Sequence, residues 1–207
     1  MSTPSNPIFT IGHSTHPVEL FIDLLRRNGV TAVADVRSAP YSRHNPQFNQ
    51  EAIEAALRPH HIHYVFLGRE LGARSDDSAC YVDGRVQYAR LAAAPAFQEG
   101  LERVMRGARE YRIALMCAEK EPLECHRTIL VAHRLAARGG EVVHIHADGH
   151  TERHEDALTR LLDVVGLPAQ DLFQSREQLV SEALARQEAR IAYVDARLAA
   201  ESAGDSR

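Results

Sequence analysis

Thiol, imidazole and guanidinium groups gather in the segment from Cys117 to Arg127. Cys117 ends the hydrophobic run 113–116, which is short and continuous, as in a buried strand of a parallel sheet. After a polar loop, Cys125 and His126 open a segment whose apolar residues recur at helical spacing. The amino end of a helix favours anions and lowers thiol pKa values. The segment therefore predicts a reactive or ligand-binding thiol site.

Cys117 has three interpretations that the sequence leaves open. As a nucleophile it would be activated by backbone donors and by a positive group such as Arg37, and its thiolate would carry sulfur or form a covalent adduct. As a metal ligand it would join Cys125 and one or both of His13 and His126 around zinc or iron. As a buried structural thiol it would be inert. The spacing of the two cysteines matches no standard zinc-finger pattern, so the spacing alone gives the metal little support.

Short apolar runs that alternate with amphipathic segments predict the framework for these groups. We expect strands over residues 7–12, 31–36, 62–68, 113–116 and 141–149. We expect helices over residues 17–30, 50–60, 86–111 with an interruption at Pro95, from Cys125 onward, and 155–166. A strand, a helix and a second strand of these lengths form a right-handed parallel crossover. The sequence thus predicts an α/β, Rossmann-like three-layer fold with a mostly parallel sheet.

Length and composition predict one main domain followed by a tail. The chain has 207 residues, of which 44% are hydrophobic, and this is enough to bury a substantial core. We expect the α/β domain to span residues 1–167 and a charged, alanine-rich helical extension to span residues 168–207. The extension would pack on the core or join two copies into a homodimer, and a solvated helix is the alternative.

Cysteine usage and charge limit the compartment and the partners. Three cysteines are too few for a secreted disulfide framework, and an odd number cannot all form pairs. We therefore expect free thiols, with Cys80 an incidental residue outside the site. No basic segment precedes an apolar one at the N-terminus, and no apolar run approaches the ~18–20 residues that span a bilayer. We therefore expect a cytoplasmic protein without a membrane partner. The net charge of −4 does not indicate nucleic acid, although a nucleic-acid ligand stays possible.

Three loops are expected to meet at one edge of the predicted sheet. The carboxyl ends of parallel strands share an edge, and ligands bind there at the switch in strand order. The loops carry side chains suited to proton transfer, anion binding or metal ligation: His13 and Ser14 in the first, Asp35, Arg37 and Tyr41 in the second, and Cys117, Glu119, Cys125, His126 and Arg127 in the third.

Two of these residues, Arg37 and Arg127, are expected to bind an anionic group of the ligand. Arg37 follows a buried strand directly, so it would have little freedom and could clamp an anion. The structural alternative is an ion pair of Arg37 with Glu119 or Glu70 that only stiffens the edge of the sheet.

Three stretches closely resemble, in sequence and in order, a bacterial and archaeal protein family: TIGHSTHPVELFIDLLRRNGV, ADVRSAPYSRHNPQFN and LMCAEKEPLECHR. The family is domain of unknown function 488, and the resemblance covers roughly residues 7–165. It implies an α/β fold but no established activity. It also implies that the signature motifs of the family include the expected site residues His13, Ser14, Arg37, Asn49, Cys117, Glu119, Cys125, His126 and Arg127, with Asn49 among those that bind substrate.

A looser likeness is to rhodanese-type sulfurtransferases, which also have a strand ending in Asp-Val-Arg and a later strand ending in a catalytic cysteine. Here residues 35–37 and Cys117 would be those elements. The loop after Cys117 departs from that pattern, because it is longer and contains Cys125 and acidic residues such as Glu119. Carboxylates would oppose a bound sulfur anion.

The leading hypothesis is an enzyme with a cysteine-centred active site that acts on a small anionic or nucleotide-like substrate. Cys117 or Cys125 would be the nucleophile or sulfur carrier, and His13, His126 or Glu119 would move protons. A second hypothesis is a metalloprotein in which the cysteines and histidines hold zinc or iron for hydrolysis or redox chemistry.

A third hypothesis is a binding module without chemistry, for a nucleotide or the end of a nucleic acid. Arg37 and Arg43 would contact phosphate, and Tyr41 and Phe48 would stack on bases. In such a module, cysteine substitutions would leave the affinity for the ligand unchanged.

Overall fold

A six-stranded sheet in the order β3-β2-β6-β1-β7-β8 runs through the centre of the protein. The computed structural model describes residues 6–204. The strands of the sheet are β1 (Ile8–Gly12), β2 (Ala32–Asp35), β3 (His63–Phe66), β6 (Ile113–Cys117), β7 (Val142–Ile145) and β8 (Thr151–Arg153). Neighbouring strands pair in parallel except β7 and β8, which are antiparallel. The predicted α/β, Rossmann-like fold with a mostly parallel sheet is confirmed.

Side chains alternate between the two faces of the sheet and build a core on each face. Phe9, Val33 and Met116 point to the face covered by α1 (Val18–Arg27) and α2 (Gln50–Leu57). The neighbouring residues of the same strands, such as Ile8, Ala34 and Leu115, belong to the core on the other face. The helices on that face are α4 (Tyr88–Ala93), α5 (Pro95–Gly107), α6 (His133–Ala136) and α7 (His154–Val164). Helices therefore enclose the sheet on both sides, as the three-layer prediction requires.

The helix that follows β6 begins as a π-helix. A 3₁₀ turn, η4 (Pro122–Glu124), precedes the π-helix η5 (Arg127–Ala132), which leads into α6. Every residue of η5 is buried. Single π-helical turns occur frequently at functional sites. The helix expected after Cys125 therefore begins at the expected place, with a wider hydrogen-bond spacing than an α-helix.

The structure contains two β elements beyond those predicted. One is the edge strand β8, and the other is a hairpin of β4 (Tyr81–Val82) and β5 (Arg85–Val86). The hairpin turns at Asp83-Gly84, where both φ angles are positive, as a type I′ turn requires. No strand was expected over residues 69–85, so this hairpin was missed from the sequence. Asp-Gly is a hairpin signal, but strands of two residues are too short to show an alternating pattern.

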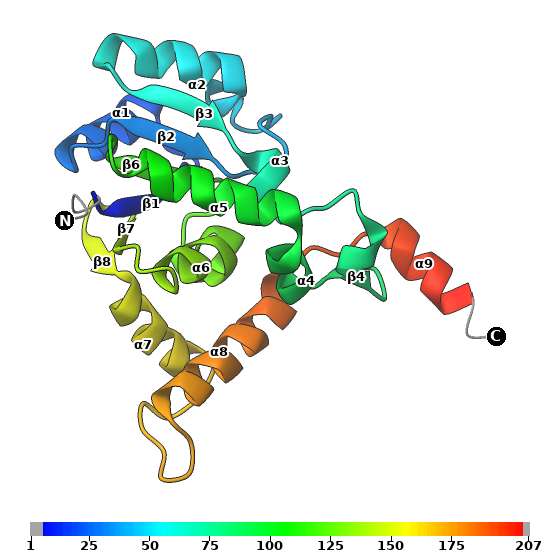
Figure 1. Cartoon of the computed structure of the whole chain (residues 1–207). Helices are drawn as coiled ribbons and strands as arrows, with labels where there is room; N and C mark the ends of the chain where they lie inside the picture. Colours follow the sequence, from blue (N-terminus) through cyan, green and yellow to red (C-terminus); the bar gives the residue numbers. More distant parts are fainter. Residues whose placement is uncertain (1–5, 205–207) are drawn as a thin grey trace.

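The C-terminal extension forms two helices, α8 (Arg176–Ile191) and α9 (Ala196–Gly204). A capping box between Ser175 and Gln178 begins α8, whose buried face packs against α7 of the same chain. After α8 the chain runs beside the hairpin: the backbone N–H of Val86 donates to the carbonyl of Tyr193 at 3.0 Å. The hairpin and α9 thus form an arm that projects from the body of the molecule (Figure 1).

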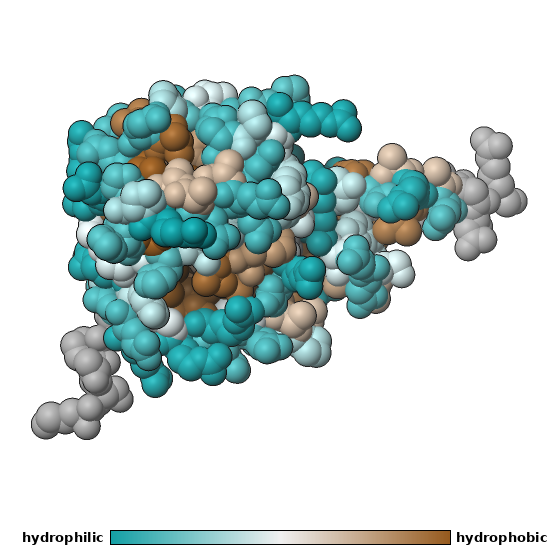
Figure 2. All heavy atoms as spheres, turned by 90° about the horizontal axis from the view of Figure 1, so that it is seen from above, coloured by the Kyte–Doolittle hydropathy of each residue, from teal (hydrophilic) through white to brown (hydrophobic). Residues whose placement is uncertain are grey.

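Viewed from above, hydrophilic residues cover most of the visible face of the body, with smaller apolar patches between them (Figure 2). Within residues 6–204, the structure has no helix with the length and apolar character of a membrane span. The expected boundary at residue 167 falls between α7 and α8. The ends of the two expected regions, residues 1–5 and 205–207, lie outside the described residues.

Candidate functional site

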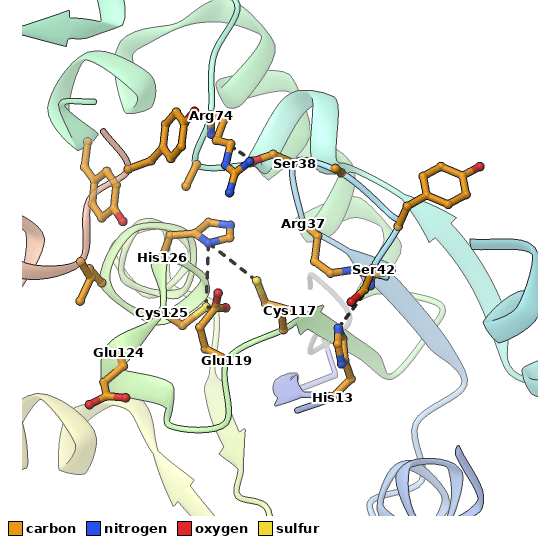
Figure 3. Close-up of a pocket in the computed structure, with 17 residues that line it drawn as sticks. His13, Arg37, Ser38, Ser42, Arg74, Cys117, Glu119, Glu124, Cys125 and His126 are labelled. Atoms are coloured by element: carbon orange, nitrogen blue, oxygen red, sulfur yellow. Dashed lines mark hydrogen bonds between the residues drawn. The ribbon is translucent and has the colours of Figure 1, made fainter. Parts of the chain in front are cut away.

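A cavity of about 360 Å³ opens at the carboxyl ends of β1, β2 and β6 (Figure 3). Loops that follow these strands line it, together with residues that follow α3 (Gly68–Leu71) and residues of the C-terminal extension. In the order of the sheet, β2 and β1 flank β6, and the chain crosses over in both directions from this point. Open α/β sheets place their ligands at such a switch point.

Cys117, Glu119, Cys125 and His126 point toward one another at the base of this cavity (Figure 3). Their donor atoms all lie within 4.8 Å of one another. His126 Nδ1 is 3.8 Å from the sulfur of Cys117 and 3.9 Å from that of Cys125. The Cys125 sulfur lies 2.9 Å from Glu119 Oε2, a distance that requires one proton between the two groups. We call these four residues the thiol cluster.

A backbone hydrogen bond fixes the orientation of the His126 ring. Its Nε2–H donates to the carbonyl of Val36 at 3.0 Å, because a carbonyl oxygen only accepts. The lone pair or second proton of the imidazole is therefore on Nδ1, which faces both sulfurs. His126 is buried, which opposes its charge, but hydrogen bonding to Cys125 and the negative charge there outweigh burial and raise its pKa.

The acidic groups of the thiol cluster hinder one another's ionisation. Hydrogen bonding with Cys125 and then burial raise the pKa of Cys117 well above its usual value. Burial also opposes ionisation of Cys125, but hydrogen bonding with Cys117 and the charge of Arg127 lower its pKa well below the usual value. Burial and the neighbouring Cys125 raise the pKa of Glu119. One thiolate is therefore favoured, and further negative charge in the cluster requires a cation.

Arg127 lies behind the thiol cluster rather than in the cavity. Its side chain is fully buried, and its guanidinium donates to the carbonyls of Glu119 at 2.7 Å and Lys120 at 3.4 Å. Its backbone N–H also donates to the sulfur of Cys125 at 3.4 Å. Among the described residues, no carboxylate lies within ion-pair distance of Arg127. It therefore holds the loop after β6 in place and supplies a buried positive charge near Cys125.

The loop after β6 passes directly over the end of β1. A Cβ atom built on Gly12 would lie 1.9 Å from the carbonyl oxygen of Glu119. Beyond Gly12, the backbone N–H groups of His13 and Ser14 donate to the carbonyls of Cys117 and Ala118. Only glycine permits this approach, so the absence of a side chain at residue 12 determines how close the loop comes to the sheet.

Arg37 lines the cavity but is bound within the protein. Its guanidinium pairs with both carboxylate oxygens of Asp35, at 2.9 Å and 2.6 Å, and donates to the carbonyl of Phe48 at 2.8 Å. The Tyr64 hydroxyl also donates to Asp35 at 2.8 Å. Arg37 therefore forms an ion pair, as the structural alternative expected. The acidic partner is Asp35, however, and neither Glu119 nor Glu70 is the counter-ion.

His13 is a neutral acceptor for Arg37. Its Nδ1–H donates to the carbonyl of Ser14 at 2.9 Å, which leaves Nε2 to accept from Arg37 Nη1 at 3.2 Å. Burial, with a smaller effect of Arg37, lowers its pKa to about 4. Its ring also stacks on Phe48, with 4.4 Å between ring centroids. The structure thus places His13 at the cavity but apart from the thiol cluster, with both ring nitrogens engaged.

The remaining predicted binding residues occupy different surroundings. Tyr41 lies at the rim of the cavity and is 61% exposed. Ser14 and Asn49 do not line the cavity, and the Asn49 side chain instead accepts from the backbone N–H of Ser42 at 2.7 Å. Phe48 is fully buried, so the proposed stacking of Phe48 on a base is wrong.

Several cavity residues were missed from the sequence, among them Arg74 and Tyr193. Arg74 follows β3 and the short helix α3. The rule that gathers loops at the carboxyl edge applies equally to this strand, so it would have found Arg74. Tyr193 belongs to the C-terminal extension, and only the packing of α8 on the core brings it to the cavity.

The C-terminal extension also supports the loop that connects the two cysteines. Gln187 of α8 is buried, and its side-chain amide donates to the carbonyl of Leu123 at 2.8 Å. On the other side of the loop, Arg160 of α7 pairs with Glu121 at 2.8 Å. The loop between Cys117 and Cys125 is therefore held by helices that come later in the chain.

The fold and the cavity define a Rossmann-like α/β protein with a thiol-rich pocket at the carboxyl edge of its sheet. Residues 17–133 match the sequence profile of a family described as Domain of unknown function DUF488. The match covers more than half of the chain, and the chain belongs to this family. No curated protein and no solved structure matches the chain. The weaker likeness to rhodaneses receives no support from these comparisons.

Proposed function

We propose that the thiol cluster is a zinc centre and that the protein is a metal-dependent enzyme of hydrolytic type. The single observation that carries the proposal is the convergence of four donor atoms within 4.8 Å at the base of a cavity. In this assignment, Cys117, Cys125 and His126 bind zinc, and Glu119 moves protons.

The chemistry of the donors supports zinc. Two sulfurs and one imidazole nitrogen are ligands of the borderline-soft type that zinc prefers. In a tetrahedral zinc site the sulfur and nitrogen ligands lie about 3.6 Å apart, given ordinary bond lengths. The distances from His126 Nδ1 to the two sulfurs are 3.8 and 3.9 Å, so small movements would complete the site.

The second hydrogen bond of His126 supports the same assignment. Metal-bound histidines usually donate their other ring N–H to a carboxylate or a backbone carbonyl, and this fixes the tautomer. His126 donates its Nε2–H to the carbonyl of Val36. Its Nδ1 is thereby held ready for a ligand bond without further rearrangement.

Charge balance also favours a cation at this place. Two thiolates and a carboxylate would bring three negative charges together beside one buried guanidinium, that of Arg127. A divalent cation offsets this excess and permits all three groups to ionise. Without a cation, the close contact between Cys125 and Glu119 holds only while they share a proton.

Glu119 is the member of the thiol cluster with exposed surface, although its carboxylate lies against the Cys125 sulfur and is largely shielded from solvent. Zinc with three protein ligands and an open position lowers the pKa of a bound water to ~7. The Glu119 carboxylate would accept a proton from the attacking water as its oxygen adds to an electrophilic centre of the substrate. Glu119 would then return this proton to the leaving group.

Elemental analysis of protein purified without an affinity tag or chelator tests the metal centre. We expect about one equivalent of zinc in the wild type, and a loss of zinc affinity in Cys117→Ser and Cys125→Ser. Cys80→Ser is the matched control, because Cys80 is also a buried free thiol but lies outside the thiol cluster. Equal metal content in all four proteins, or no metal in the wild type, would contradict the proposal.

The Glu119→Gln variant distinguishes a zinc site with an open coordination position from one that Glu119 closes as a fourth ligand. We expect this variant to retain zinc, because three ligands remain, and to hydrolyse 4-nitrophenyl acetate about 10²-fold more slowly, the low end for loss of a general base. If zinc is lost as completely as in Cys125→Ser, Glu119 is a fourth ligand and the site is structural.

Thiol catalysis by Cys125 is a second candidate, favoured by the backbone N–H of Arg127, which donates to its sulfur. Alkylation of the metal-free protein by iodoacetamide, followed by mass spectrometry, would test it. Protein that is purified without metal and is modified rapidly at Cys125 would support a nucleophile. Stoichiometric zinc that protects both cysteines from alkylation would exclude it.

A further inference from the structure

Arg74 carries a guanidinium at the cavity that is not engaged by an acidic partner. Within the part of the chain that the structure describes, no carboxylate lies within ion-pair distance of it. Arg37, the other arginine of the cavity, is paired with the Asp35 carboxylate and also donates to the carbonyl of Phe48 and to His13. Among the described residues that line the cavity, Arg74 therefore offers a ligand a guanidinium whose charge has no carboxylate partner (Figure 3).

The ring of Tyr193 holds Arg74 in place. The central carbon of the guanidinium lies 4.3 Å from the centroid of the ring, a cation–π contact. The backbone fixes the ring in turn, because the Tyr193 carbonyl accepts from Val86 and the N–H of Asp195 donates to Gly84 at 2.7 Å. One face of the guanidinium is thus covered, and its planar edge with the N–H donors stays available.

Ser38 adds a hydroxyl next to Arg74. The Ser38 oxygen accepts from the backbone N–H of Arg74 at 3.1 Å, and the hydroxyl proton remains free to donate. Both residues line the cavity. A guanidinium edge and a hydroxyl donor side by side match a group with two or more acceptor oxygens.

We propose that Arg74, supported by the ring of Tyr193, binds a carboxylate or phosphate group of the substrate on which the metal centre acts. This inference rests on the proposed function, because the base of the cavity otherwise presents mainly acidic groups, Cys125, Glu119 and Glu124. A divalent cation bound there offsets the charge of the two thiolates, so the charge of Arg74 is no longer opposed by the whole cluster and can attract an anion. The anionic group lies at Arg74, and the bond to be cleaved lies toward the thiol cluster.

Isothermal titration of the zinc-loaded protein at constant ionic strength tests the inference, with inorganic phosphate in one series and acetate in the other. We expect one of the two anions to bind, and Arg74→Ala to weaken that binding at least about tenfold, the effect of losing a charge-assisted hydrogen bond. Arg74→Lys keeps the charge but loses the planar edge, so its affinity should lie between the two. Tyr193→Leu should weaken binding about threefold, through loss of the cation–π contact.

Arg106→Ala is the matched control, because Arg106 is an exposed arginine of α5 outside the cavity. It should bind the anion as the wild type does. The series that shows binding identifies the ligand group as phosphate or carboxylate.

The failure of this inference is distinguishable from failure of the metal centre. Zinc-containing wild type that binds neither anion, or an Arg74→Ala variant that binds as tightly as the wild type, overturns the anion site alone. Wild type that contains no zinc overturns the metal centre, and the anion site with it.

Discussion

Two buried clusters with histidines lie on the same face of the sheet, and their neighbours give them opposite properties. In one, His126 faces two sulfurs and Glu119 at the base of an open cavity, and its pKa is raised. In the other, Thr10, His144 and His154 form a hydrogen-bonded chain, with 2.8 Å between Thr10 Oγ1 and His144 Nδ1 and 3.0 Å between the two imidazoles.

The second cluster holds no negative charge of its own. Burial first, and then the neighbouring imidazoles, lower the pKa values of His144 and His154. Neutral imidazoles that bond to each other fill the core, whereas an imidazole beside thiols and a carboxylate has neighbours that favour its charged form. A buried histidine therefore indicates a functional site only through the charge of its neighbours.

Arg127→Ala should disturb the first cluster and cause the largest loss of stability among these substitutions. The substitution leaves the carbonyls of Glu119 and Lys120 without donors and removes the buried positive charge near Cys125. We expect the free energy of unfolding to fall by about 3–4 kcal/mol, as for loss of a buried, hydrogen-bonded charge. Urea denaturation with a chelator present measures it, so that metal binding does not contribute.

Arg106→Ala serves as the control here as well, because it removes an arginine from an exposed position. A loss for Arg127→Ala no larger than about 0.5 kcal/mol, typical of surface substitutions, would show that the guanidinium does not support the loop.

Acid should destabilise the protein through the second cluster. The pKa of His154 is lowered from 6.5 to about 4 in the folded state, so its neutral form is favoured by folding. This contribution to the free energy of unfolding is up to about 3 kcal/mol. It is complete above pH 6.5 and is lost as the pH falls toward 4. His144 and His133 face His154 and oppose its protonation, and Glu152 favours it.

Urea denaturation at pH values between 7 and 4 measures this effect. His154→Asn keeps a polar atom near the position of Nδ1 but does not titrate, so it should lose less stability on acidification than the wild type. His60→Asn, at an exposed position, should follow the wild type. Parallel pH curves for His154→Asn and the wild type would contradict a neutral, buried His154.

Gly12→Ala would test whether the loop position maintains the first cluster. The new Cβ meets the Glu119 carbonyl, so the loop after β6 must shift. We expect a loss of about 2 kcal/mol from overpacking, together with weaker zinc binding. Gly107→Ala is the control, since its Cβ meets only the flexible end of Ile113. Unchanged zinc affinity in Gly12→Ala would show that zinc binding does not depend on the position of this loop.

The smallest expected effect concerns the support of the first cluster by the C-terminal extension. Gln187→Leu leaves the carbonyl of Leu123 without its donor, and we expect about 1 kcal/mol of destabilisation. Hydrogen exchange of residues 118–124 should increase, while that around His154 should not. Gln170→Leu, on an exposed residue, is the control. Equal exchange in both variants would show that α8 does not stabilise the loop.

The sequence predicted which loops meet, because parallel strands order their carboxyl ends without reference to side chains. Cys117, Cys125, His126 and Glu119 are therefore found together at the edge where they were expected. The sequence could not predict which arginine faces the cavity. Arg37 and Arg127 are both drawn inward by carbonyl and carboxylate acceptors whose positions depend on tertiary packing.

The short β elements and the contacts of the C-terminal extension also could not be predicted from the sequence. The hairpin depends on two-residue strands, which carry too little pattern to identify. Tyr193 reaches the cavity because α8 packs on α7 and the following residues run beside the hairpin, and neither contact is local in sequence.

Tyr193 lines the cavity from a part of the chain that lies outside the segment matched by the family. The four residues of the thiol cluster and Arg74 lie within residues 17–133, the segment that defines the family, whereas Tyr193 lies beyond it. Exchange of the C-terminal extension would thus change the lining of the cavity at Tyr193 and remove the support that Gln187 gives to the loop between the two cysteines.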